Sequence, residues 1–452
     1  MNIPSQAPGQ HAASDDTSVR KNALFALFLV STFNYIDRTI LSILQIPIKT
    51  ELGLSDAQMG ALTGLSFALF YATLSLPVAR LADRVSRRFL VAASLAIWSA
   101  MTGLSGLAIG FGTLVFFRIG VAIGESGSVP ASVSLLADYY PPARRATAMS
   151  AWGLALPAGM MLGYSVTGWL AATVGWRLSF AIIGMAGLLL APLALALIKE
   201  PPRGRFEAAG TRTETVPVRA ALTFLWQEKA FRYVVLATML HGFSQYAMMT
   251  WNAPFFTRNH GLSLQNVSLL MAMLSGAGGA VGMFLGGFLA DRLAVRDQRW
   301  RVWIMALAVG TTVPVALAQY LVASTGLSIA MAAISSLLMI AYYGPVLAVT
   351  QSLVPAHMRA FSNAVLLLIF NLFGLGLGPW CTGMLSDLLV RQFGAGDNGL
   401  RYALSLSLIS SVVGAMLFVY AARLYRAAMA QGKPPEVPGS RPIPTTTAPA
   451  KG

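Results

Sequence analysis

The dominant feature of this sequence is a series of long apolar segments separated by shorter polar ones. A helix needs about 20 largely apolar residues to cross a bilayer, and only 11% of this chain is charged, against about 25% in a typical soluble protein. Twelve segments meet this length, at approximately 22–46, 56–79, 89–110, 113–137, 147–172, 177–198, 231–256, 264–290, 302–323, 327–352, 360–387 and 401–425. The pattern predicts an all-α membrane protein with twelve transmembrane helices.

The polar segments divide this series into two equal sets. One long polar stretch, residues 199–230, follows the sixth apolar segment. We therefore predict an N-terminal six-helix bundle over 22–198, a cytoplasmic interdomain loop over 199–230 and a C-terminal six-helix bundle over 231–427. Residues 1–21 are polar and lack the apolar core of a signal peptide, and residues 428–452 are rich in proline. Both ends are expected to be disordered.

Basic residues gather on one side of this arrangement. The even-numbered loops and both terminal segments carry most of the lysines and arginines outside the apolar segments, whereas the odd-numbered loops carry few. Short loops rich in lysine and arginine stay in the cytoplasm. We therefore expect a multi-pass protein of the cell inner membrane with both termini in the cytoplasm.

The two sets of segments are related in sequence. The stretch ARLADR at 79–84 follows the second segment, and GFLADR at 287–292 follows the eighth. Likewise, PPARRA at 141–146 follows the fourth segment, and PAHMRA at 355–360 follows the tenth. Matches at equivalent positions indicate a duplicated six-helix unit. Internal repeats in a membrane chain indicate a transporter whose binding site lies between the halves near the bilayer midplane.

Four charged residues lie in the middle of apolar segments. Asp37 and Arg38 belong to the first segment, and Arg118 and Glu125 to the fourth. No other acid or base, histidine aside, occupies such a position. A charge at membrane depth costs a few kcal/mol or more. These four residues therefore predict a paired internal site for proton coupling or substrate binding.

Helix geometry gives the approximate depth of these charges. With a rise of 1.5 Å per residue, Asp37 lies roughly 22 Å from the cytoplasmic end of its helix, at about the level of Arg118. An Asp37–Arg118 pair is therefore expected. Glu125 lies near the midplane and further from its nearest base. Because burial favours the neutral carboxyl, we expect Glu125 to take up and release a proton during a transport cycle. The alternative is a permanently ionised cluster that fixes helix packing.

The second half carries polar and aromatic groups in its apolar segments, where the first half carries charges. Such groups tend to face the interior of a helix bundle, and together they would suit an amphiphile with an anionic head. The alternative is hydrogen bonding between helices. The substrate-contact candidates are Asn34 and Tyr35 in the first half and His241, Gln245, Tyr246, Trp251, Asn252, Tyr342, Tyr343, Asn363 and Asn371 in the second.

These stretches resemble the major facilitator superfamily. Its signature between helices 2 and 3 matches ARLADRVSRR at 79–88, although Ala79 and Ser86 stand where the family usually has glycine. The resemblance implies two six-helix bundles related by a pseudo-two-fold axis, which work by alternating access. It also implies an interdomain latch at the cytoplasmic helix ends, made in one conformation and broken in the other. Its expected members are Asp83, Arg84, Arg87, Arg88, Arg145, Asp291, Arg292 and Arg359. The alternative for these residues is simple topology charge.

Within this superfamily the chain resembles bacterial spinster homologues. The supporting stretches are NYIDRTILS at 34–42, RIGVAIGESGSVPA at 118–131 and ADYYPPARRATAMS at 137–150. This resemblance implies a proton-linked carrier of lysophospholipids or sphingoid phosphates, with Asp37, Arg38, Arg118 and Glu125 at the family's charged positions. Symporters of small organic anions share the NYxDR pattern and stay an alternative. A non-transporting membrane sensor on the same fold is a further one.

Other classes of function find little support in the sequence. It has no nucleotide-binding loop, no HExxH metal motif and no nucleophile elbow, so we expect no enzyme activity, no cofactor and no metal site. Cys381 is the single cysteine. Nucleic acid is not an expected partner, because the basic residues lie between membrane segments. The expected partners are membrane lipids, protons and a small-molecule or lysolipid-like substrate, and we expect a monomer.

Overall fold

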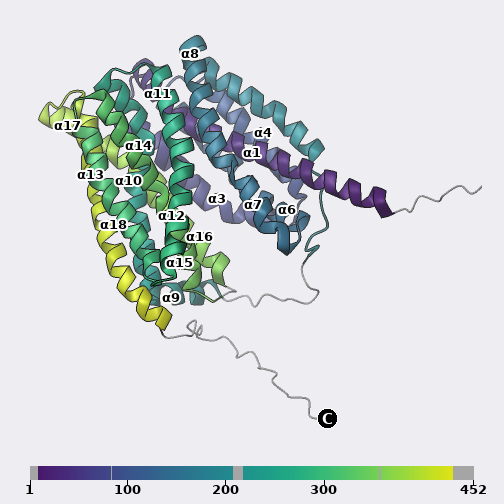
Figure 1. Ribbon diagram of the computed structural model, residues 1–452. Helices are drawn as coiled ribbons and strands as arrows, with labels where there is room; N and C mark the ends of the chain where they lie inside the picture. The colour runs from purple at the N-terminus through teal and green to yellow at the C-terminus, as the bar shows by residue number, and fades with distance from the viewer. Residues whose placement is uncertain (1–8, 83, 207–216, 356–357, 431–452) are drawn as a thin grey trace, which may run out of the picture.

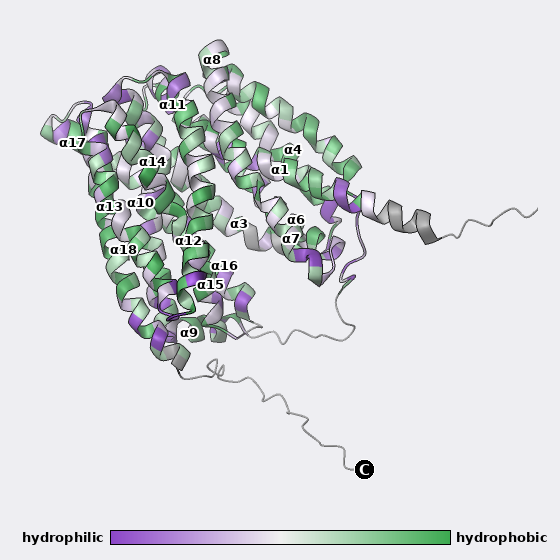
Figure 2. Cartoon of the chain, in the orientation of Figure 1, coloured by the Kyte–Doolittle hydropathy of each residue, from purple (hydrophilic) through white to green (hydrophobic). Residues whose placement is uncertain are grey.

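The computed structural model describes residues 9–82, 84–206, 217–355 and 358–430, and these residues form helices joined by short connections (Figure 1). Among these described residues, ten helical runs are long and apolar enough to cross a membrane. One of these runs divides at Gly175 into two helices, and α10 adds one more, which makes twelve. Figure 2 shows hydrophilic residues concentrated at helix ends and connections, as expected for helices that cross a bilayer.

The first half contains six membrane helices built from eight α-helices and one π-helical turn. They are α1 (Gly9–Leu52), α2 (Asp56–Gly60), η1 (Ala61–Leu65), α3 (Ser66–Ala82), α4 (Arg87–Ser105), α5 (Phe111–Glu125), α6 (Ser128–Tyr139), α7 (Pro142–Gly153) and α8 (Ala155–Leu197). The long helix α8 changes direction at Gly175, whose φ of 80° is a conformation that residues with a side chain rarely adopt. That turn separates the fifth membrane helix from the sixth.

The second half repeats this arrangement after the connecting helix α9 (Val218–Gln227). Its elements are α10 (Lys229–His260), α11 (Leu264–Met271), η2 (Ala272–Gly278), α12 (Gly279–Ala294), α13 (Trp300–Leu321), α14 (Thr325–Ala341), α15 (Tyr343–Ser352), α16 (Arg359–Ile369), η4 (Phe370–Leu377), α17 (Gly378–Phe393) and α18 (Asn398–Ala430). Within the described residues, π-helical turns interrupt the second, eighth and eleventh membrane helices.

The structure differs from the expected boundaries at two places. Helix α1 begins at Gly9, so residues 9–21 are helical where we expected disorder. Extending an existing helix needs no new nucleation, so a polar stretch can continue it. The expected interdomain loop contains α9, because Ala221, Phe224 and Leu225 form an apolar face that packs in the core of the second half. Residues 1–8, 207–216 and 431–452 lie outside the described part of the chain.

The two halves meet at one end of the bundle. One apolar cluster belongs to the first half and one to the second, while a third joins them through residues such as Leu54, Met59, Trp251 and Phe256. In Figure 1 the halves converge where α11 and α17 lie and diverge toward α6, α7, α9 and α16. We call these the closed end and the splayed end.

Candidate functional site

The four membrane-depth charges form two ion pairs between α1 and α5. Nη1 of Arg118 lies 3.1 Å from Oδ2 of Asp37, so the expected pair forms. We expected Glu125 to lie further from its nearest base, and this expectation is wrong. Nη2 of Arg38 lies 2.9 Å and Nε of Arg38 lies 3.0 Å from Oε2 of Glu125. Depth along a helix axis locates only the backbone atoms, and the long arginine side chain spans the remaining distance.

The two pairs differ in their access to solvent. Asp37 and Arg118 are both buried, and Asp37 also accepts a hydrogen bond from the Thr102 hydroxyl. Glu125 is fully buried too, but the Arg38 side chain is 23% exposed. Of the two arginines, Arg38 is therefore the one that solvent or a ligand can reach, whereas its partner Glu125 has no exposed surface.

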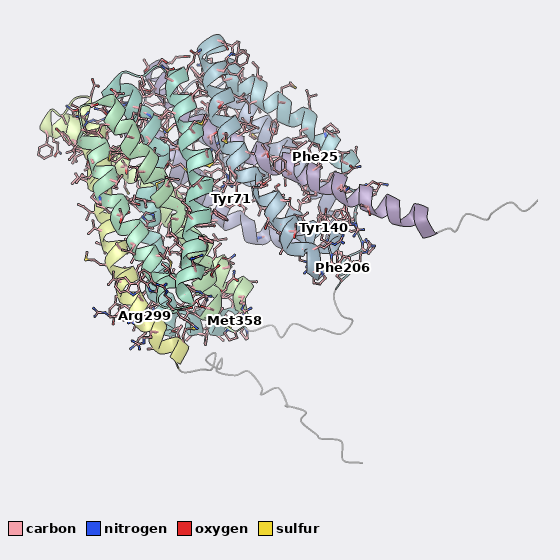
Figure 3. The ribbon with its side chains drawn as sticks, viewed as in Figure 1. Phe25, Tyr71, Tyr140, Phe206, Arg299 and Met358 are labelled. Atoms are coloured by element: carbon pink, nitrogen blue, oxygen red, sulfur yellow. The ribbon has the colours of Figure 1, made fainter. Side chains whose placement is uncertain are left out.

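Aromatic rings surround the Arg38 guanidinium on the side of the first half. Its Cζ lies 5.8 Å from the ring centre of Tyr35, 5.1 Å from that of Phe67 and 5.2 Å from that of Tyr71. Figure 3 labels Tyr71 on α3, away from both ends of the bundle. Each such cation–π contact contributes about 0.5–2 kcal/mol. The rings hold the guanidinium in place without neutralising it.

Two tyrosines of the second half lie near this group. Tyr246 of α10 lies within electrostatic range of Arg38, Tyr35 and Tyr71, and Tyr343 of α15 within range of Tyr35. We call Arg38, Glu125 and the four tyrosines the central site. Tyr71 and its ring partner Phe67 were missed by the sequence analysis, and their spacing of four residues on a predicted helix was the available signal.

Buried polar atoms beside the central site lack partners. Oε1 of Glu125 and Nδ2 of Asn34 are buried and make no hydrogen bond to any described residue. The Asn34 side chain lies next to Glu125. Buried polar groups are normally hydrogen-bonded, and because the Asn34 amide lies close enough to act as a donor to Glu125, the two side chains form one polar pair beside Arg38. In the second half, Tyr246 donates a 3.5 Å hydrogen bond to Asn371, and Oδ1 of Asn363 is buried without a partner among the described residues.

Other polar candidates of the second half are bonded to neighbouring helices. His241 is buried, with Nδ1 2.9 Å from the Ser411 hydroxyl and Nε2 3.1 Å from the Met339 carbonyl oxygen. The carbonyl can only accept, so Nε2 carries a proton and Nδ1 accepts from Ser411. Tyr342 donates to Gln245 over 2.7 Å. In this conformation His241, Gln245 and Tyr342 therefore form hydrogen bonds between helices of the second half.

Trp251 and Asn252 are bonded in the same way. The Trp251 indole donates to the Pro379 carbonyl over 2.9 Å, which ties α10 to α17. Asn252 accepts hydrogen bonds from Gln319 and Tyr320 of α13. Both side chains therefore support helix packing in this conformation. Among the described residues, no group of histidines, cysteines and carboxylates could hold a metal ion.

The residues expected to form an interdomain latch lie at the splayed end. Asp83 falls outside the described residues. Arg87 is buried within the first half, where it pairs with Asp138 and binds Glu200 over 2.7 Å. Burial raises the pKa of Glu200, but hydrogen bonds from the Arg88 backbone N–H and the Arg87 side chain hold that pKa below its ordinary value. We expected Arg87 to lie between the halves, whereas its described partners belong to the first half and to the segment that directly follows α8.

The remaining latch candidates also have local partners or environments. Arg145 donates to the Ala137 carbonyl, Arg292 lies over the Phe288 ring, and Asp291 is 80% exposed and lies 4.0 Å from Arg301. The side chains of Arg84 and Arg88 are exposed, and Arg359 begins α16. No ion pair between the halves is present among these residues in the described part of the chain. An interdomain latch formed by these residues stays a prediction for a conformation in which the two halves meet at the splayed end.

A junction between the halves that the sequence analysis missed lies at the closed end. Asp56, the first residue of α2, binds Arg258 of α10 through contacts of 2.7 and 2.8 Å and accepts a 2.8 Å hydrogen bond from Ser386 of α17. Asp387 in turn accepts hydrogen bonds of 3.0 and 2.8 Å from the backbone N–H groups of Asp56 and Ala57. A carboxylate from one half thus caps a helix N-terminus of the other.

Comparison with known proteins accords with this architecture. Residues 27–379 match the Major Facilitator Superfamily. The MFS-type efflux pump of Mycolicibacterium smegmatis is 34% identical over 412 residues, covering 89% of this chain and 93% of the pump. The hexuronate transporter of Bacillus subtilis is 27% identical over 370 residues, covering 80% of this chain and 86% of that protein.

A solved structure extends the comparison to three dimensions. The crystal structure of a bacterial homologue of the human lysosomal transporter spinster, in an inward-facing and unoccupied conformation, superposes with a TM-score of 0.84 at 32% identity. The match covers 91% of this chain and 98% of the homologue. This chain belongs to the Major Facilitator Superfamily of transporters, and within it the chain resembles the bacterial spinster homologue.

Proposed function

We propose that this transporter is proton-coupled, works by alternating access and moves an amphiphilic anion such as a lysophospholipid or a sphingoid phosphate. The observation that carries the proposal is the pairing of an accessible Arg38 with a fully buried Glu125. One group can bind an anion and the other can bind a proton. Because they share one ion pair, a change at either group alters the other.

Protonation of Glu125 would release Arg38 for the substrate. A neutral carboxyl no longer holds the guanidinium, so an anionic head group can take its place while the aromatic rings keep Arg38 in position. Loss of the substrate would then favour the ionised carboxylate and the original pair. A proton and an anion that bind in this linked way can drive each other across the membrane when the accessible end changes.

The surroundings of Arg38 favour an amphiphile over a compact polar anion. Arg118, the second cation, is buried and bonded to Asp37, so a single accessible charge would meet the head group. Tyr71 and Tyr246, which are partly exposed, would offer ring surface to a hydrocarbon chain. The resemblance to spinster homologues implied this substrate class, and the solved structure of one such homologue matches 91% of this chain.

Small organic anions are a second candidate class. The hexuronate transporter of Bacillus subtilis shares 27% identity over most of this chain. The hydroxyl groups of Tyr35, Tyr71, Tyr246 and Tyr343 could donate hydrogen bonds to a hydroxylated acid. Direct comparison of a lysophospholipid with a hexuronate as substrates separates the two classes.

We also infer that both termini face the cytoplasm of a protein in the cell inner membrane and that the transporter acts as a monomer. The asymmetry of lysine and arginine between loops supports this orientation. The closed end would then face outward, and the splayed end would face the cytoplasm, in accord with the inward-facing structure of the spinster homologue.

Uptake into proteoliposomes tests proton coupling. With an imposed pH gradient, the wild type should concentrate its substrate. Glu125→Gln should lose gradient-driven accumulation, while downhill exchange persists, because a permanently neutral residue releases Arg38 but carries no proton. The matched control is Glu51→Gln, an acid of α1 that binds Trp176 and Arg177 away from the central site. Accumulation by Glu125→Gln at the wild-type level would assign Glu125 a structural role.

A further inference from the structure

The connecting helix α9 has apolar side chains on two adjoining faces. Ala221, Phe224 and Leu225 are buried against the second half. Beside this buried face, Val218, Leu222 and Trp226 are 61%, 45% and 59% exposed. A spacing of four residues puts these three side chains in one stripe along the helix. An apolar stripe of this kind is unfavourable in water, and the described residues do not cover it.

Basic groups border the exposed stripe. Arg219 and Lys229 are exposed, and Arg232 lies over the rings of Trp226 and Tyr233 at 5.8 and 5.4 Å. A surface pocket also opens on α9, and its lining residues are Pro217, Arg219, Ala220, Thr223, Phe224 and Gln227. Arg219 of α9 and Lys229 and Arg232 of the first turn of α10 thus lie near the apolar stripe and Trp226, and this combination is typical of helices in the interfacial layer of a membrane.

The neighbours of α9 place it where the apolar surface of the bundle ends. Helix α18 exposes Ile409, Met416 and Tyr420 along one side. The Tyr420 ring contacts the Tyr233 ring, with their centres 4.8 Å apart, and Tyr233 in turn is next to Arg232. Tyrosine and tryptophan concentrate at the boundary between hydrocarbon and head groups. In Figure 3 Arg299 lies at this same splayed end.

We propose that α9 lies in the head-group layer of the membrane and binds anionic phospholipids. Val218, Leu222 and Trp226 enter the acyl boundary, and Arg219 and Lys229 bind the lipid phosphates. The occupant is an anionic lipid because Arg219, Lys229 and Arg232 are cations, whereas the neighbouring Glu228 caps the N-terminus of α10, and a neutral head group would not neutralise the cations. This contact anchors the connection between the two halves to the bilayer surface and makes the transporter responsive to lipid charge.

Lipid titration of the purified full-length protein tests the binding. The probes are dioctanoyl phosphatidylglycerol and dioctanoyl phosphatidylcholine in neutral detergent, with the midpoint of thermal unfolding as the readout. Phosphatidylglycerol should stabilise the wild type at lower concentration than phosphatidylcholine does. The Arg219→Gln/Lys229→Gln variant should need about 25-fold more phosphatidylglycerol, since one basic residue contributes about five-fold in affinity near an anionic surface.

Control variants make the outcome decisive. The Arg219→Lys/Lys229→Arg variant keeps both charges and should retain the wild-type response. Arg391→Gln removes an exposed cation from α17 and should also retain it. Inorganic phosphate at matched concentration should not stabilise the protein. Equal responses to the two lipids, or an unchanged titration of the double glutamine variant, would overturn the proposal.

Depth measurement tests the position of α9 independently. A fluorophore at Leu222→Cys, in a Cys381→Ser background and in liposomes with one fifth phosphatidylglycerol, should be quenched by lipids brominated on their acyl chains. A fluorophore at Pro202→Cys, on the exposed segment after α8, should not be quenched. Absence of quenching at Leu222 would place the helix in water and contradict the proposal.

Discussion

At the residue scale, burial separates the roles of the two ion pairs between α1 and α5. Removing one partner of a buried pair costs about 3–5 kcal/mol, because the other charge stays unpaired. Asp37→Asn leaves the buried Arg118 in this state. Glu125→Gln leaves Arg38, which is partly exposed and still lies among three rings. We therefore predict that Asp37→Asn lowers the midpoint of thermal unfolding more than Glu125→Gln does.

A milder substitution at the same pair provides the control. Thr102→Val removes one hydrogen bond to Asp37 but keeps both charges, so its effect should be about 1–3 kcal/mol at most. Asp37→Asn should also impair uptake driven by a pH gradient, although less specifically than Glu125→Gln. Equal stability of Asp37→Asn and the wild type would show that Arg118 is satisfied without its carboxylate.

At the element scale, glycines allow the halves to approach closely at the closed end. A Cβ on Gly383 of α17 would lie 2.3 Å from the Asp56 carbonyl oxygen, and one on Gly64 of η1 would lie 2.5 Å from the Leu375 carbonyl oxygen. Both contacts are with backbone atoms, which cannot rotate away. The π-helical turns η1 and η4 lie at this interface, and such turns are common at functional positions in helices.

Gly383→Val should therefore separate the halves at the closed end. Overpacking of a close contact costs about 1–3 kcal/mol, enough to change the population of the closed arrangement five-fold or more. Electron–electron distance measurement between spin labels at Thr50 and Arg391 would report the change as a longer component. Gly287→Ala on α12 is the control, since its Cβ would meet nothing within 4 Å. Identical distance distributions for Gly383→Val and the wild type would contradict this.

At the scale of the whole molecule, polar contacts around Asp56 join the two halves at the closed end. Asp56→Asn weakens the pairing with Arg258. It should therefore raise several-fold the population of molecules in which the two halves have separated at the closed end. A cysteine at Asn371, in a Cys381→Ser background, should then react faster with an impermeant thiol reagent added outside intact cells.

The same labelling experiment includes a control variant and also tests which end of the transporter faces outward. Asp397→Asn removes an exposed acid between α17 and α18 and should leave the labelling rate unchanged. Fast outside labelling of the Asn371 cysteine already in the unmutated background would indicate that the splayed end faces outward, against the proposed orientation. An unchanged rate in Asp56→Asn would show that the apolar cluster shared by both halves is sufficient for closure.

Much of the architecture could be predicted from the sequence because a bilayer imposes strong one-dimensional constraints. A membrane helix needs a fixed length of apolar residues, and repeated motifs reveal a duplicated unit. The pair of Asp37 and Arg118 could also be predicted, since residues at equal depth on adjacent helices can meet. These conclusions depend on position along the membrane normal, which helix rise converts directly from residue number.

Only the tertiary structure decided which side chains face one another. Glu125 meets Arg38, His241 is bonded within the second half, Tyr71 joins the central site and Asp56 links the halves. The apolar face of α9 likewise became evident only where it packs. Each of these contacts depends on how helices rotate about their axes and which neighbours they pack against. Nearly all residues of a membrane helix are apolar, so their pattern weakly specifies rotation, which close packing between helices determines.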